Sequence, residues 1–124
     1  MQRQTRQRDA IRDAFIRAER PLSPQEVLHQ AQYRSPNLGI ATVYRNLKTL
    51  VASGWLRPVE LPGTPDRYEL ADRGHHHHFH CRCCDRVYDI DGCPGDLQDL
   101  CPPGFQLESH EIILYGLCRN CKVP

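Results

Sequence analysis

No stretch of these 124 residues approaches the roughly 20 consecutive apolar residues that a membrane-spanning helix requires. The N-terminus also lacks the basic-then-apolar pattern of an export signal, so we expect a cytoplasmic protein with no membrane partner. Internal repeats and low-complexity linkers are absent too. The length suits one domain of ordinary size or two very small ones, and a very small domain often needs a metal to stabilise it.

Cysteine, by contrast, is plentiful. There are seven cysteines, an odd number that argues against a fully paired disulfide framework. Thiols stay reduced in a cytoplasm, which favours metal binding instead. Four of the thiols form two Cys-x2-Cys pairs, Cys81 with Cys84 and Cys118 with Cys121. This is the pattern of a tetrahedral thiolate zinc site, because a tight turn directs both sulfurs of a pair to one ion; a redox dithiol is the alternative.

Three further thiols lie outside these pairs. Their commonest role is that of a small buried hydrophobic side chain, and a redox or soft-metal role is the alternative. We expect burial for all three: Cys83, Cys93 and Cys101.

Histidines cluster directly before the first cysteine pair. Five of the seven lie within residues 75–80, too many to belong to the cysteine site itself. Their number indicates a second metal centre and therefore a sensing role. On a strand, alternate side chains face opposite sides, which would separate His76 and His78 from His75 and His77. Simple exposure to solvent is the alternative for any one of these rings.

A net charge of +1 conceals an asymmetry between the two halves of the chain. Residues 1–74 contain 12 Arg and Lys against 8 Asp and Glu, a net +4, whereas residues 75–124 contain 4 against 7, a net −3. A basic half joined to an acidic, ligand-rich half is typical of a nucleic-acid reader attached to a metal-binding module. We therefore expect two domains, residues 1–72 and 73–124.

The first half predicts a winged helix. Apolar residues recur at helical spacing over residues 5–18. Ser23-Pro24-Gln25-Glu26 is a capping box that begins a second helix, which should run to about residue 33. A third helix is expected over residues 40–53, with Gly54 as its C-terminal cap. Residues 55–61 and 67–70 then predict a hairpin, the wing.

The predicted third helix carries the expected DNA contacts. Helix-turn-helix proteins read base edges mainly from the N-terminal residues of their recognition helix. Arginine suits guanine, and Thr or Tyr can reach phosphates or thymine methyls. Away from its apolar stripe this helix offers four such side chains: Thr42, Tyr44, Arg45 and Lys48. An ordinary solvated helix face is the alternative.

The second half predicts a small module built from strands. Residues 86–91 alternate like a strand, residues 96–101 suit one or two helical turns, and residues 105–115 favour a further strand with buried Ile112, Ile113 and Leu114. So few elements cannot enclose a large core. Zinc binding and dimerisation would supply the missing stability.

Three motifs, in family order, resemble the ferric uptake regulator (Fur) family. They are GIATVYR at residues 39–45, HHHHFHCRCC at residues 75–84, and the terminal segment over residues 104–121. Together they are spread over most of the chain, from residue 39 to residue 121. The resemblance implies an α+β homodimeric repressor that binds double-stranded operator DNA. It also implies an N-terminal winged helix-turn-helix domain followed by a small α/β dimerisation and metal-binding domain.

The resemblance further implies three groups of ligands. Structural zinc would be held by the paired thiols Cys81, Cys84, Cys118 and Cys121. The regulatory metal would be held by Glu69, His76, His78 and Asp89, and a third site by His75, His77 and His110. Pro21 stands where family members often add a histidine to the regulatory site. The usual acidic partner of the third site aligns with Cys93 or Asp96.

The identity of the sensed metal stays open at this point. Imidazole and carboxylate ligands suit Fe²⁺, Mn²⁺ or Zn²⁺, and we expect a sensor of zinc or iron, with manganese as a further possibility. A peroxide- or redox-sensing regulator of the same family is one alternative. A zinc-dependent or thiol-redox enzyme is another. We expect no enzyme, because no His-Glu-x-x-His helix is present and every plausible ligand already has a binding role.

Overall fold

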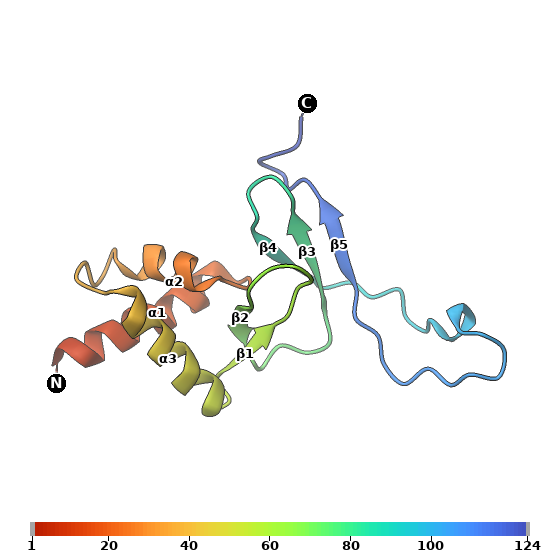
Figure 1. The fold of residues 1–124 in the computed structure, drawn as a ribbon, viewed down its shortest axis with the longest axis horizontal. Helices are drawn as coiled ribbons and strands as arrows, with labels where there is room; N and C mark the ends of the chain where they lie inside the picture. Colours follow the sequence, from red (N-terminus) through yellow and green to blue (C-terminus); the bar gives the residue numbers. More distant parts are fainter. Residues whose placement is uncertain (1, 124) are drawn as a thin grey trace. The chain divides into compact units, whose positions relative to one another are not determined.

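The computed structural model describes residues 2–123, which divide into two compact units, Met1–Arg73 and Gly74–Pro124. The first unit contains three helices and a hairpin (Figure 1). In order, these are α1 (Gln2–Ala18), α2 (Pro24–Ala31), α3 (Ile40–Ala52), β1 (Leu56–Val59) and β2 (Arg67–Leu70). The winged-helix prediction is thereby confirmed. Among the described residues, no helix is long and apolar enough to cross a membrane.

Local capping sets the ends of the second and third helices. The Ser23 hydroxyl accepts a hydrogen bond from the Glu26 amide, and the Glu26 carboxylate accepts one from the Ser23 amide, at 3.1 and 3.0 Å. At the end of α3, Gly54 adopts a φ of 81°, which favours glycine. The Trp55 amide then bonds to the Leu50 carbonyl at 3.0 Å. This turn ends α3 and leads directly into the wing.

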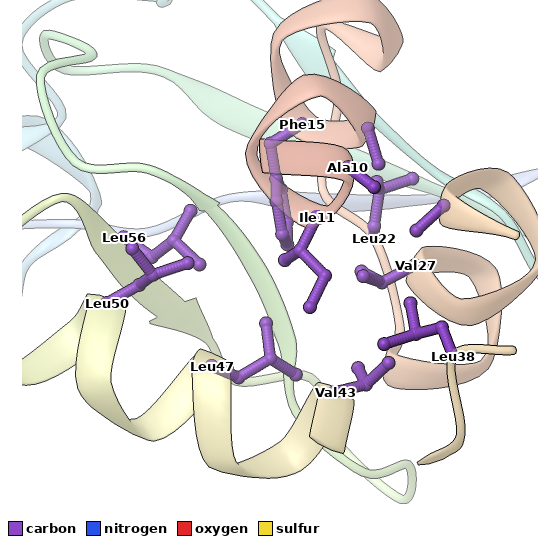
Figure 2. Packing of buried hydrophobic residues seen from close by; sticks show 12 residues of the cluster. Ala10, Ile11, Phe15, Leu22, Val27, Leu38, Val43, Leu47, Leu50 and Leu56 are labelled. Carbon is purple, nitrogen blue, oxygen red and sulfur yellow. The ribbon is translucent and has the colours of Figure 1, made fainter. Parts of the chain in front are cut away.

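The core of the first unit holds α3 by its apolar face. Figure 2 shows Val43, Leu47 and Leu50 directed toward Ile11 and Phe15 of α1. All five are at most 2% exposed. Burying each of these large side chains contributes roughly 1.5–3 kcal/mol. The opposite face of α3 is therefore presented to solvent on a rigid support.

The second unit is a three-stranded sheet in the order β4-β3-β5. Its strands are β3 (His77–Cys81), β4 (Val87–Ile90) and β5 (Ile113–Gly116), and a single 3-10 turn, η1 (Gln98–Leu100), lies between the last two. β3 pairs with β4 antiparallel and with β5 parallel. Both neighbours of β3 thus bring their own side chains beside the histidine run.

The predicted strand over residues 105–115 is largely wrong. Only Ile113–Gly116 pairs with β3, and residues 105–112 form no strand although their composition favours one. The predicted burial of Leu114 is also wrong, since its side chain is 50% exposed. β5 lies at the sheet edge, and Tyr115, which points to the other side, is 42% exposed. Ile112 and Ile113 are half-buried.

Candidate metal centres

Parallel pairing of β3 with β5 brings the two cysteine pairs together. Cys81, the last residue of β3, lies opposite Gly116 at the end of β5. Cys118 follows two residues later, so both Cys-x2-Cys turns leave the same end of the sheet. The sulfurs of Cys81, Cys84, Cys118 and Cys121 all lie within 4.8 Å of one another. The 33 residues between the pairs thus connect two turns that lie at the same end of the sheet.

The separation of these sulfurs suits zinc. Cys84 Sγ lies 3.8 Å from Cys118 Sγ. A tetrahedral ion with Zn–S bonds of about 2.3 Å separates its sulfurs by about 3.8 Å. Four thiols at such spacing form a closed site, the arrangement that structural zinc uses.

Backbone hydrogen bonds prepare Cys81 as a thiolate. The amides of Cys84 and Cys118 donate to Cys81 Sγ at 3.5 and 3.4 Å. Although burial opposes ionisation, these bonds lower the pKa of Cys81 to about 6. Hydrogen bonding to Cys118 and the other thiols instead raises the pKa of Cys121. Among these thiols, the negative charge is therefore favoured on Cys81 Sγ, which accepts two hydrogen bonds from backbone amides.

Tyr88 is a supporting residue that the sequence did not single out. Burial raises the pKa of Cys118, but hydrogen bonds from the Asn120 amide, Cys121 and the Tyr88 hydroxyl outweigh it, and the net shift is downward. Tyr88 lies on β4, outside both cysteine motifs. Tyr88 lies close to Cys118 because of strand pairing. The spacing of residues in the sequence therefore could not predict this contact.

We expect Tyr88→Phe to weaken zinc retention at the cysteine site about tenfold, because outer hydrogen-bond partners tune metal affinity by factors of about 10–100. Competition with a chromophoric zinc chelator measures the change. Tyr33→Phe, in the first unit and 77% exposed, is the matched control and should behave like the unaltered protein. If both variants retained zinc equally well, Tyr88 would have no role in the cysteine site.

A second cluster forms on one side of β3. Asp89 of β4 lies directly opposite His78, and His76 lies two residues earlier on the same side. The Nε2 atoms of His76 and His78 lie 3.5 and 3.6 Å from Asp89 Oδ1. The Nδ1 of His76 donates to the Gly74 carbonyl at 2.6 Å, which orients the ring and makes Nε2 the nitrogen that can act as a ligand. These three residues therefore converge on one point.

Glu69, the fourth residue predicted for that cluster, belongs to the first unit. It lies on β2 opposite Arg57 of β1, and its carboxylate accepts a 2.7 Å hydrogen bond from Arg57 Nε. The side chain is only 2% exposed. Its participation in the regulatory site stays a prediction.

A third cluster occupies the other side of the histidine run. His75 Nε2 and His110 Nε2 lie 3.3 Å apart, as expected for two residues predicted to share the third site. Cys93, one of the two residues aligned with the usual acidic partner of this site, lies among them: its Sγ is 3.5 Å from His75, 3.4 Å from His77 and 3.3 Å from His110. Asp96, the other residue aligned with this position, instead accepts a hydrogen bond from the Gln98 amide. Cys93 is thus the fourth member.

Of these four residues, His77 is the least ready to bind a metal ion. Its burial, together with the neighbouring His75 and His110 rings, lowers its pKa, so the ring is neutral at neutral pH. Its Nδ1 accepts a hydrogen bond from the Ile112 amide at 3.2 Å. A neutral ring then carries its proton on Nε2, toward Cys93. Metal binding at that nitrogen must displace the proton.

The predicted burial of the three unpaired cysteines is wrong. Cys83 and Cys93 are exposed and Cys101 is half-buried. The short strands of the second unit and the irregular segment after β4 do not enclose these positions. Cys83 lies in the first cysteine turn, where its thiol contributes to raising the pKa of Cys121.

The side chains predicted to contact DNA lie on α3, away from its buried stripe. Tyr44, Arg45 and Lys48 are exposed, and Thr42 is half-buried. Arg45 donates to the Thr42 hydroxyl at 2.9 Å, which holds the guanidinium near the N-terminal end of the helix. The helix thus offers a cationic, hydrogen-bonding surface near its start.

Comparison with known proteins decides the family. The sequence model of the ferric uptake regulator family matches residues 2–115. The chain belongs to this family. It is 31% identical to the transcriptional regulator FurA of Mycobacterium tuberculosis over 124 residues, which are 98% of this chain and 84% of FurA.

Solved structures of Fur proteins agree with this assignment. The Helicobacter pylori ferric uptake regulator, which has three functional metal-binding sites, is 25% identical and superposes with a TM-score of 0.67 over 93% of this chain and 79% of its own. The Francisella tularensis regulator, solved with iron, is 26% identical with a TM-score of 0.69 over 93% and 90%. This Fur family member is a metal-responsive transcriptional regulator.

Proposed function

We propose that this Fur family member is a cytoplasmic, homodimeric repressor that binds double-stranded operator DNA when its regulatory site holds Zn²⁺ or Fe²⁺. The regulatory ligands are His76, His78 and Asp89, joined by Glu69. The four paired cysteines hold a structural zinc in the same chain. No enzymatic activity is proposed, because each ligand cluster has a binding role.

One observation supports the regulatory site above all others. Two imidazole nitrogens converge on the Asp89 carboxylate, and the His76 ring is already oriented by the Gly74 carbonyl. The three side chains are at most 14% exposed. Two imidazoles and a carboxylate, grouped and shielded in this way, suit a borderline divalent cation. A bound ion would neutralise the carboxylate and accept a nitrogen ligand from each ring.

The donor set suits Fe²⁺, Mn²⁺ and Zn²⁺, and the general order of affinity favours zinc over the other two. Metal analysis of protein purified without added metal, followed by operator binding with each ion in turn, tests the assignment. We expect one tightly held zinc per chain, and operator binding restored by Zn²⁺ or Fe²⁺ at the second cluster. An operator affinity that is the same with and without each of the three ions would contradict metal control.

The exposed side chains of α3 are proposed to read the operator. We expect Arg45→Ala to weaken operator binding by about 1–3 kcal/mol and to relax sequence preference at one position, as loss of a guanine contact does. Metal content should stay unchanged, because Arg45 is remote in sequence from every ligand. Mobility-shift titration at fixed salt against the operator and against single-base variants measures both effects.

Lys48→Ala provides the contrast. A phosphate contact carries no sequence information, so its loss should weaken binding to all sequences alike and reduce the salt dependence by about one unit of slope. If Arg45→Ala and Lys48→Ala both leave affinity unaltered, α3 is not the reading helix.

A further inference from the structure

The third cluster differs from the regulatory one in its ligands: it has three imidazoles and a thiol, and no carboxylate. Its members come from three separate places, the start of β3, the chain just after β4 and the chain just before β5. The ligand atoms of His75, His77, Cys93 and His110 all lie within 4.8 Å of one another. None of the four has a role in the proposed regulatory site.

The spacing of these atoms is that of a tetrahedral zinc site. Zn–N bonds of about 2.0 Å and a Zn–S bond of about 2.3 Å place the ligand atoms about 3.3–3.6 Å apart. The measured separations are 3.3 Å between the His75 and His110 nitrogens and 3.3–3.5 Å from Cys93 Sγ to the three rings. Each of these distances alone would also suit a hydrogen bond, but a single ion requires all four ligand atoms to lie close to one another, and they do.

We propose that Cys93 makes this cluster a thiolate site selective for zinc, whose metal ties both ends of the 94–109 segment to β3. A thiolate favours zinc over manganese, which prefers oxygen ligands, and the general order of affinity places zinc above iron(II). On binding, the Cys93 thiol loses its proton to solvent as the sulfur–zinc bond forms. The ion also displaces the Nε2 proton of His77, and Nδ1 takes up a proton from solvent in place of the hydrogen bond from the Ile112 amide. This inference goes beyond the proposed function and does not depend on DNA binding.

The segment that such an ion would close has little structure of its own. Residues 94–109 contain only η1, and Leu100 and Phe105 are 80% and 64% exposed. Cys93 and His110 lie immediately outside its two ends, and their ligand atoms are 3.3 Å apart. One ion bound to both residues would hold the two ends of the loop together. Fixing both ends would restrict the conformations of the whole segment.

The test uses full-length protein with its four-cysteine zinc left in place. Cobalt(II) is added as a spectroscopic substitute after weakly bound ions have been removed. We expect a sulfur-to-cobalt charge-transfer band that Cys93→Ser abolishes and that Cys101→Ser, the matched thiol control, retains. The double variant His76→Ala with His78→Ala should also retain the band, which separates this site from the regulatory one.

A second readout follows the segment itself. Zinc at about ten times its dissociation constant should slow chymotryptic cleavage at Leu100 and Phe105 about tenfold, because only the metal-free form is cut. Cys93→Ser should remove this protection, and Cys93→Asp should restore binding with a preference shifted toward manganese. The proposal is overturned if the cobalt band survives in Cys93→Ser, or if zinc leaves the cleavage rate of the unaltered protein unchanged.

Discussion

Cys118→Ser is expected to lose one tightly held zinc per chain and to unfold the second unit, and the dimer with it. Structural zinc contributes about 10–16 kcal/mol of apparent binding free energy in small zinc-folded peptides, which is also folding free energy. Few side chains of the second unit are buried and could replace that contribution. Among its described residues the buried ones are Cys81, Val87, Cys118, His77 and His80. Removing one of four thiolates should therefore unfold this unit at moderate temperature.

Elemental analysis and sedimentation measure the two consequences, zinc content and oligomeric state. Cys81→Ser should behave in the same way, because its sulfur receives the two backbone hydrogen bonds that stabilise the thiolate. Cys101→Ser is the matched control, a half-buried thiol outside every cluster, and should retain zinc and dimer. One zinc per chain in a dimeric Cys118→Ser protein would contradict the four-thiolate assignment.

The sequence predicted those parts of the molecule whose cause is local. The Ser23 and Glu26 capping box and the Gly54 turn act within a few residues, so their motifs identified the ends of α2 and α3. The four-residue apolar spacing of α3 likewise identified its buried face. The strand of the histidine run also follows from local alternation, which places His75 and His76 in different clusters.

Features that depend on pairing between distant segments were missed. Cys93 lies 17 residues from His110 and 18 from His75, and no spacing rule connects it to either; only the family resemblance pointed to this position, and it left Cys93 and Asp96 open. Tyr88 reaches Cys118 only because β4 and β5 flank the same strand. The length of β5 was overestimated for the same reason, since composition favours a strand from residue 105 but pairing with β3 decides that it begins at Ile113.

The double variant His76→Ala with His78→Ala should retain the cysteine zinc and the dimer but lose metal-dependent operator binding. A regulatory ion shifts the equilibrium only by its differential affinity for the DNA-binding form, and such couplings amount to about 1–3 kcal/mol. Operator affinity with and without metal should therefore differ about 5–150-fold in the unaltered protein and not at all in the variant. Mobility shifts at matched free metal concentrations measure the ratio.

The matched control is His75→Ala with His77→Ala, the same change on the other side of β3. Those rings face Cys93 and His110 rather than Asp89, so their loss should reduce the metal response much less. The two double variants thus separate the clusters while removing the same number of imidazoles from the same strand. If the His75 and His77 variant abolished the response while the His76 and His78 variant retained it, the regulatory ion would belong beside Cys93. The Asp89 cluster would then lose its proposed role.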